Sequence, residues 1–381
     1  MSRRSCRDKR KGNIIVLTMF LMVGLMALVA FSVDVGYLCV TRQQLQRSAD
    51  AAALAACWEL VDHAAPTGQS DAMALALSAR QTADQFARLN PVLCENPTLL
   101  DEDVQIGYLD NPSDRACPLI VGSSDPPNAV TVRVRRSQEA NGAVPLFFAR
   151  VLGQREARLE AEATAALLTN IWGFRTPPNG KPIGMLPFAL DEDTCLDMLA
   201  GDGDDHWKWD PASEAVVSGA DGASEVNLYP QGTGSPGNRG TVDSGASNNS
   251  NADIARQITV GVSDGDLEHL GGELVLDPET GMLYLNGDTG ISAGVKDELA
   301  SIIGEPKVLP VFRDVTGNGN NATYTIVDFV GVRILEVKLT GSVSKKRVII
   351  QPATIVTSGV VGAPGESGVG HYIYSPAWLV R

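Results

Sequence analysis

The longest apolar stretch of the chain covers residues 14–33, IIVLTMFLMVGLMALVAFSV, and carries no charged side chain. A helix of this length, at 1.5 Å per residue, covers about 30 Å, which is the thickness of a bilayer's hydrocarbon core. Only a helix satisfies its own backbone hydrogen bonds in lipid, so the pattern predicts a single transmembrane helix. The expected anchor residues are Ile14, Leu17, Phe20, Leu25, Leu28 and Val33.

Basic residues directly before this stretch predict its orientation. The leader, residues 1–13, contains one acid, Asp8, and the positive-inside rule keeps such a leader in the cytoplasm. The chain after Asp34 would then lie outside. A signal peptide, with an apolar region of about 7–15 residues, is one alternative. Prepilin-type cleavage after Gly12 is another, although Leu17 stands where a pilin has Glu. The expected topology residues are Arg3, Arg4, Arg7, Lys9, Arg10 and Lys11.

A helical pattern continues beyond the apolar stretch. Residues 34–63 contain no proline and many good helix formers, which predicts a stem that prolongs the membrane helix. Small and apolar side chains recur on it at roughly helical spacing. This stripe would pack either against the protein's own domain or against another subunit. The expected helix-packing residues are Asp34, Leu45, Ala49, Ala52 and Ala55.

Two further regions follow the stem. The first, residues 64–174, mixes helical and strand patterns, and residues 175–184, RTPPNGKPIG, have the composition of a linker. For residues 158–166 the composition also allows a helix, but the alternation of side chains favours a strand. In this region we expect a helix at 71–89, a short amphipathic helix at 145–152, and strands at 104–108, 130–134 and 158–166.

The second region, residues 185–381, is expected to be β-rich. Residues 218–251 are rich in Gly, Ser and Asn, which predicts a long mobile surface loop or an elaborated turn outside the core. Residues 274–276 and 282–285 flank a turn sequence and predict a hairpin. Further expected elements are a short helix at 295–303 and strands at 308–312, 323–329, 332–339 and 345–350. The fold class is therefore α+β, with a long N-terminal transmembrane and stem helix before a mixed, largely β extracytoplasmic region.

Charge and cysteine content narrow the function. The chain has 381 residues and a net charge of −14, which argues against nucleic acid as a partner. No C-x-x-C motif is present, so a zinc or thioredoxin-type site has no support. Outside the membrane, four cysteines would allow one or two disulfides, with the pairing open. These are Cys57, Cys94, Cys117 and Cys195.

The N-terminal segment also carries recognisable strings. The apolar stretch runs into Asp34-Val-Gly36-Tyr37, and residues 45–56 read LQRSADAAALAA. Together these strings, over about residues 10–57, resemble the N-terminal segment of the TadG-like proteins of Tad/Flp pilus assembly. Residues 185–190, MLPFAL, are similar to a phrase further along some relatives.

This resemblance implies a single-pass component of pilus, secretion or adhesion machinery. Such a protein would sit in the bacterial cytoplasmic membrane with its bulk outside, and its partners would be pilus or secretion-complex subunits. The resemblance implies no catalytic residues and no cofactor. Many relatives carry a von Willebrand A-type domain with a D-x-S-x-S metal motif. No Asp in this chain is followed two residues later by Ser, so that domain is not expected.

One motif raises the alternative of a membrane-anchored serine hydrolase. Gly290-Ile-Ser292-Ala-Gly294 matches G-x-S-x-G between a predicted strand and a predicted helix, and Asp328 and His371 follow in hydrolase order. Ser292 also stands where an N-cap would satisfy the first N–H groups of the helix. We favour the cap, because short Gly/Ser patterns are common in a chain with 38 glycines.

A second motif raises the alternative of a cation-dependent adhesin or binding module. Asp314, Asn318 and Asn320 mimic the start of a calcium loop, with oxygen ligands at alternating positions. The twelfth position is Thr325 in place of a bidentate Glu, so a β-turn is favoured over a Ca²⁺ site. The leading hypothesis is thus a non-enzymatic, membrane-anchored TadG-like protein.

Overall fold

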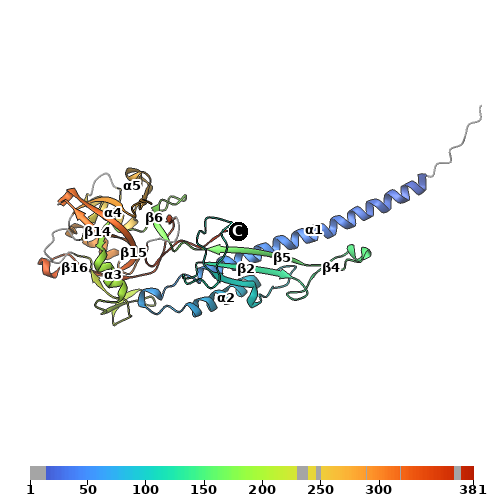
Figure 1. The fold of residues 1–381 in the computed structure, drawn as a ribbon, viewed down its shortest axis with the longest axis horizontal. Coiled ribbons are helices and arrows are strands. Elements are labelled where there is room, and N and C mark those ends of the chain that lie inside the picture. The colour runs from blue at the N-terminus through green and yellow to red at the C-terminus, as the bar shows by residue number, and fades with distance from the viewer. Residues whose placement is uncertain (1–13, 230–238, 246–249, 289, 318, 364–369) are drawn as a thin grey trace, which may run out of the picture. The chain divides into compact units, whose positions relative to one another are not determined.

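The computed structural model describes residues 14–229, 239–245, 250–288, 290–317, 319–363 and 370–381 (Figure 1). The protein is α+β, and a long apolar N-terminal helix precedes a largely β region, which confirms the predicted fold class. The chain divides into two compact units. Unit 1 takes in the chain up to Ala52 together with Ala83–Val104 and Val132–Ala163, and unit 2 takes in Ala53–Thr82, Gln105–Thr131 and Thr164–Arg381. Residues 64–174 thus contribute to both units, and residues 175–184 belong to unit 2.

Helix α1 (Ile14–Trp58) is one continuous helix of 45 residues. It ends earlier than the predicted stem end at residue 63, because Asp62 directs the chain into the next turn. The Asp62 carboxylate accepts the backbone N–H groups of Ala64 and Ala65, each at 2.9 Å, at the start of η1 (Ala65–Thr67). A short polar side chain that bonds nearby backbone in this way competes with continued helix.

Unit 1 contains α1 up to Ala52 and parts of α2 (Ala72–Arg88), β2 (Ala129–Arg136) and β5 (Leu159–Ala166), each of which also has residues in unit 2. The Ser48 hydroxyl donates to the carbonyl of Ala87 on α2 at 3.2 Å. The Gln46 amide donates to the carbonyl of Glu162 on β5 at 3.1 Å. These bonds fix α1 against both a helix and a strand. The predictions of a helix at 71–89 and of strands at 130–134 and 158–166 are confirmed.

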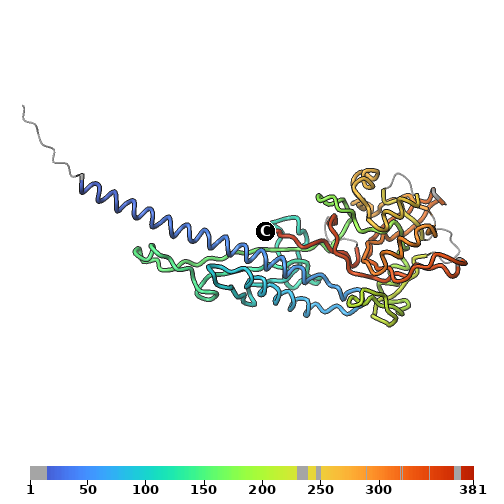
Figure 2. Tube along the Cα trace, turned by 180° about the vertical axis from the view of Figure 1, so that it is seen from behind, coloured from blue at the N-terminus to red at the C-terminus, as the bar shows by residue number. Residues whose placement is uncertain are grey.

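A hairpin of unit 1 extends along α1, as Figure 2 shows. Its strands are β3 (Val144–Pro145) and β4 (Glu156–Ala157), which pair antiparallel. Between them lies η3 (Ala149–Leu152), a single turn of 3₁₀ helix. The predicted amphipathic helix at 145–152 is therefore wrong in length, because β3 takes its first residue and Gly153, at φ 88°, ends the turn.

The largest sheet lies in unit 2 and has the strand order β10-β16-β15-β13-β11-β7-β14. Strand β14 also pairs with β15, so five of the strands form a closed ring. The strands are β7 (Phe188–Asp191), β10 (Val226–Asn227), β11 (Gly240–Val242), β13 (Leu283–Asp288), β14 (Pro306–Thr316), β15 (Ala322–Lys338) and β16 (Arg347–Pro352). Long β15 makes the closure possible. It pairs with β13 along Ala322–Ile326, with β14 along Thr323–Arg333, and with β16 along Val332–Lys338.

Buried apolar side chains fill two clusters around this ring. One contains Phe188 and Leu309 beside helices α3 (Glu192–Ala200), α4 (Asn251–Val260) and α6 (Lys296–Ser301). The other includes Phe312 and Tyr324, whose rings meet edge to face at 5.1 Å.

The remaining described elements are η2 (Asp101–Asp103), β1 (Val104–Gly107), β6 (Ile171–Arg175), β8 (Trp207–Asp210), β9 (Ala215–Ser218), α5 (Asp264–Leu267), η4 (Glu268–Leu270), β12 (Glu273–Val275), η5 (Ala293–Val295), η6 (Gly319–Asn321), η7 (Val343–Lys345), β17 (Ile355–Val356), β18 (Val360–Gly362), β19 (Ile373–Tyr374) and β20 (Trp378–Leu379).

Three predictions for the second region are wrong. The Gly/Ser/Asn-rich segment 218–251 was expected outside the core, but its described residues contribute β10 and the buried strand β11 to the main sheet. Residues 230–238 and 246–249 of this segment lie outside the described residues. Gly240 permits this, because a Cβ there would lie 2.3 Å from both the Asp288 carbonyl and the Tyr324 hydroxyl. The predicted hairpin at 274–285 is a turn between two sheets, since β12 pairs with β6 and β13 with β11 and β15. The two strands predicted at 323–339 are the single strand β15.

The approach of Gly304 to Trp209 yields a stability prediction. Gly304 has φ 89°, and a Cβ there would lie 2.1 Å from the Trp209 ring. Arg333 covers that ring, with its guanidinium carbon 5.3 Å from the centroid, so the ring cannot simply move aside. We expect Gly304→Ala to lower the free energy of unfolding by about 2–3 kcal/mol, measured by denaturant titration of the detergent-solubilised chain.

The matched control is Gly184→Ala, where a Cβ would meet only the Lys307 side chain at 4.0 Å. Its effect should stay within about 0.5 kcal/mol. Equal losses in the two variants would contradict the proposed clash.

Candidate membrane anchor and the Asp34 clamp

The N-terminal half of α1 exposes apolar side chains on all sides. Within the described residues, α1 is the one helix that is long and apolar enough to cross a membrane, with a mean hydropathy of 2.5 over its most apolar 18-residue window. No residue of that window is buried. Of the predicted anchor residues, Ile14 begins the helix and Leu17, Phe20, Leu25, Leu28 and Val33 are exposed. The predicted topology residues Arg3, Arg4, Arg7, Lys9, Arg10 and Lys11 lie outside the described residues.

Asp34 marks the point where this exposed surface ends. Its side chain is buried, and its two carboxylate oxygens accept the backbone N–H groups of Phe147, Phe148 and Ala149 at 2.7–3.3 Å. We call this set of bonds the Asp34 clamp. The Tyr37 ring, one turn further along α1, meets the Phe147 ring edge to face at 5.2 Å. The clamp therefore holds the end of the β3–β4 hairpin at a fixed position along α1.

Beyond Asp34, one side of α1 is buried at helical spacing. Thr41, Leu45, Ser48, Ala49 and Ala52 are buried in unit 1, and Ala53, Ala56 and Cys57 are buried in unit 2. Of the predicted packing residues, Asp34, Leu45, Ala49 and Ala52 are buried, and Ala55 is half-buried. In the structure the stripe is buried by other parts of the same chain.

The structure brings together two of the three candidate hydrolase residues. His371 and Asp328 form an ion pair with Nε2 and Oδ2 3.0 Å apart. Ser292 is exposed and acts as the N-cap of η5, where its hydroxyl oxygen accepts the N–H of Gly294 at 3.1 Å. Among the described residues, no hydrogen bond links Ser292 to His371. The cap predicted for Ser292 is confirmed.

The calcium-like motif falls at the connection between β14 and β15. Asp314 is exposed on β14 and pairs in register with Thr325. Asn318 lies outside the described residues, and Asn320 belongs to the short turn η6. The predicted turn is therefore present as the connection of two paired strands. Within the described part of the chain, no group of three His, Cys, Asp or Glu side chains could hold a metal ion.

Among the described cysteines, whose pairing the sequence left open, no disulfide is formed. Cys57, Cys94, Cys117 and Cys195 are all free thiols in the structure. Cys57 and Cys195 are buried, and burial raises the pKa of the Cys195 thiol to about 12. Sequence alone could count these cysteines, but it could not show that two of them serve as small apolar core residues.

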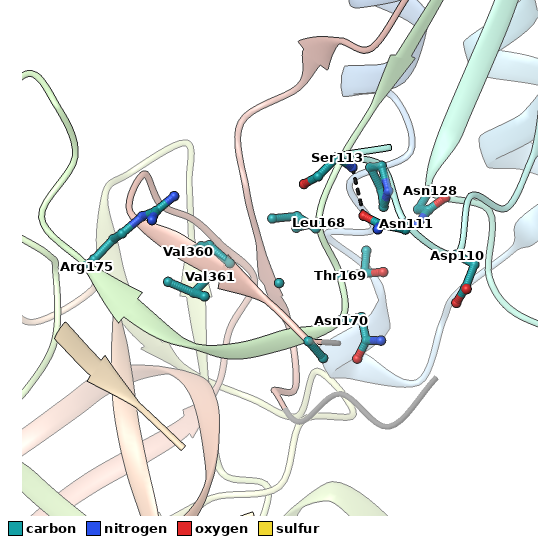
Figure 3. Close-up of a pocket in the computed structure, with 13 residues that line it drawn as sticks. Asp110, Asn111, Ser113, Asn128, Leu168, Thr169, Asn170, Arg175, Val360 and Val361 are labelled. Carbon is teal, nitrogen blue, oxygen red and sulfur yellow. Dashed lines mark hydrogen bonds between the residues drawn. The ribbon is translucent and has the colours of Figure 1, made fainter. Parts of the chain in front are cut away.

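Unit 2 contains a polar pocket of about 220 Å³ (Figure 3). Its described lining includes one carboxylate, from Asp110, and one guanidinium, from Arg175. The Asn128 amide is already committed, since it accepts the N–H of Leu109 at 2.7 Å and donates to its carbonyl at 2.9 Å. Among the described residues that line it there is no histidine and no second carboxylate.

The fold and this site define an α+β protein carried on a long helix with one candidate membrane span. Residues 44–165, about a third of the chain, match the family described as putative Tad-like Flp pilus-assembly. The resemblance to Tad/Flp proteins is thereby confirmed, and it associates the chain with Flp pilus assembly. No curated protein and no solved structure matches the chain.

The clamp predicts a local effect of removing the Asp34 carboxylate. Asp34→Ala leaves three N–H groups without their acceptor, so we expect a loss of about 2–4 kcal/mol in stability. Backbone hydrogen exchange at residues 147–149 should accelerate. Asp50→Ala is the matched control, because Asp50 on the same helix accepts one bond, from the Gln46 amide four residues earlier. Unchanged exchange at residues 147–149 in Asp34→Ala would refute the clamp.

The Asp328–His371 pair predicts a pH effect. The hydrogen bond to Asp328 holds the pKa of His371 above its ordinary value of 6.5, despite the opposing effect of burial. The pair therefore stabilises the fold fully below about pH 6.5, and this contribution is lost as pH rises through the higher folded-state pKa. His371→Gln should lower the melting temperature more at pH 5.5 than at pH 9.

The matched control for this pH effect is His269→Gln, since His269 is exposed. It should show no such difference between the two pH values. A His371→Gln deficit that is the same at both pH values would contradict the assignment.

Proposed function

We propose that the chain is a membrane-anchored, non-enzymatic component of Tad/Flp pilus assembly or of related secretion machinery. Residues 14–33 of α1 cross the cytoplasmic membrane, the basic leader stays in the cytoplasm, and the bulk of the chain lies outside. The observation that carries this proposal is the combination, in one helix, of a fully exposed apolar half and a stripe buried in a region that matches a pilus-assembly family.

The exposed apolar half supports anchoring because water is a poor solvent for it. Large side chains such as Phe20 and Leu25 are more than half exposed, and their neighbours around the helix are equally apolar. A water-soluble helix buries such side chains on at least one face, whereas a helix in lipid leaves them outward on every face. The six basic residues of the leader favour the cytoplasm for the N-terminus.

The buried stripe bears on how partners would bind. Leu45, Ala49 and Ala52 are already packed within the chain, so a pilus or secretion-complex subunit would contact other surfaces. A bulky substitution at Ala52 would thus test folding, not assembly. The outward side of α1 beyond Asp34, where Val40 is exposed, is available to a partner helix.

One experiment on tagged cells tests both location and partners. Full-length protein with a C-terminal epitope tag is produced in a strain that assembles Flp pili, and intact spheroplasts are treated with protease. We expect the tag to be digested while a cytosolic marker survives. From untreated spheroplasts, chemical crosslinking and tag purification should recover pilus-assembly proteins.

The controls separate the two parts of the proposal. Replacing Arg3, Arg4 and Arg7 with Glu weakens the charge bias and should increase the protease-protected fraction. A tag that survives until the spheroplasts are lysed would refute the orientation. Recovery of the tagged protein without any pilus-assembly protein would refute the assembly role.

A further inference from the structure

The hairpin end of unit 1 presents apolar side chains with no protein cover. Phe147 and Phe148 are about half exposed, whereas Val151 and Leu152 are 88% and 85% exposed. We call residues 146–152 the apolar tip. The Asp34 clamp and the contact between Tyr37 and Phe147 hold it against α1, so its position is fixed and its exposure is not that of a loose loop.

The apolar tip lies beside the part of α1 that is proposed to cross the membrane. A groove of about 770 Å³ separates the two, with one wall formed by α1 from Met22 to Leu38 and the other by the apolar tip. At 1.5 Å per residue, the wall reaches from Asp34 to Met22, about 18 Å along α1 toward its N-terminus. A tip at this depth would lie within the hydrocarbon of the outer leaflet.

The groove offers apolar contact and almost no polar recognition. Its lining side chains are apolar except for Asp34, whose carboxylate is occupied by the clamp. A protein ligand that needed a defined register would find no free donor or acceptor there. Acyl chains require none, and they already surround the exposed half of α1 under the proposed function.

Charge around the apolar tip favours a lipid surface. Arg150 and Arg155 are exposed on or just after the tip, and Glu156 is the one acid between residues 146 and 158. Arg158 is also exposed, but it forms an ion pair with Glu139 at 4.0 Å. This local positive charge contrasts with the net charge of −14 for the whole chain. Long basic side chains next to an inserted apolar segment reach back to lipid phosphates.

We infer that the apolar tip inserts into the outer leaflet beside α1 and that phospholipid acyl chains fill the groove between them. This inference rests on the proposed anchoring by α1. The chain then contacts the bilayer at two places, the transmembrane helix and the tip, which the clamp holds at a fixed distance along the helix. The tip thereby limits rotation of unit 1 about the axis of α1.

Site-specific fluorescence on the full-length chain tests the inference. Cys6, Cys39, Cys94 and Cys117 are replaced by serine, which leaves the buried Cys57 and Cys195. Single cysteines are then introduced as Val151→Cys in the tip, Leu25→Cys on α1 and Val260→Cys on α4, and each is labelled with an environment-sensitive dye. Val260, an exposed valine in unit 2, is the matched control for Val151. The labelled chains are reconstituted into phosphatidylcholine–phosphatidylglycerol vesicles, with and without a doxyl group on the acyl chains.

The expected result has three parts. The label at residue 151 emits at shorter wavelength than the label at residue 260, loses intensity with doxyl lipid, and resists quenching by aqueous iodide. The label at residue 25 behaves like the label at residue 151. Such a pattern supports tip insertion.

The contrary results are distinguishable. If residue 25 is quenched by doxyl lipid but residue 151 is quenched by iodide, the tip lies in water and the inference fails while the anchor stands. If the label at residue 151 resists both quenchers, protein covers the tip, as a second copy of the chain would. The inference then also fails. If doxyl lipid quenches neither position, the anchoring proposal itself fails together with the inference.

Discussion

The carboxylate of Asp34 fixes the relation between two parts of the chain that are more than 110 residues apart in sequence. On one side of it, α1 exposes apolar side chains all around, and on the other side α1 buries a regular stripe. A continuous helix with an exposed apolar half and a partly buried half needs a fixed boundary between the two. The three N–H groups of the hairpin end set this boundary, because each would otherwise lie beside an apolar helix without a partner.

The elements that the sequence predicts well are those whose side chains follow one period over many residues. The continuous α1, the helix α2 and the strand β2, with Val130, Val132 and Val134 on one side, all follow from such periods. The errors concern long-range pairing. Strand β11 lies in a Gly-rich segment, and only the close approach of Asp288 and Tyr324 explains why glycine is required there. Strand β15 continues through Gly331, where sequence alone suggests a break.

The candidate site was predictable to a similar extent. The apolar half of α1, the position of Asp34 at its end and the small side chains of the stripe can all be recognised by pattern. The partner of Asp34 cannot, because backbone N–H groups belong to every residue but proline and leave no mark in a sequence. The sequence predicts a short amphipathic helix at 145–152, whereas a single 3₁₀ turn leaves Val151 and Leu152 exposed. For the same reason a count of thiols could not reveal that Cys57 and Cys195 are core residues.

The closed ring of strands in unit 2 affects how neighbouring copies of the chain can associate. An edge strand of an open sheet offers unpaired backbone groups to any neighbouring chain. At high concentration, β-rich proteins with such edges aggregate through them. Strands β7, β11, β13, β14 and β15 each have a partner on both sides, and the terminal strand β10 is only two residues long. The main sheet of unit 2 therefore offers little unpaired backbone to a neighbouring copy of the chain.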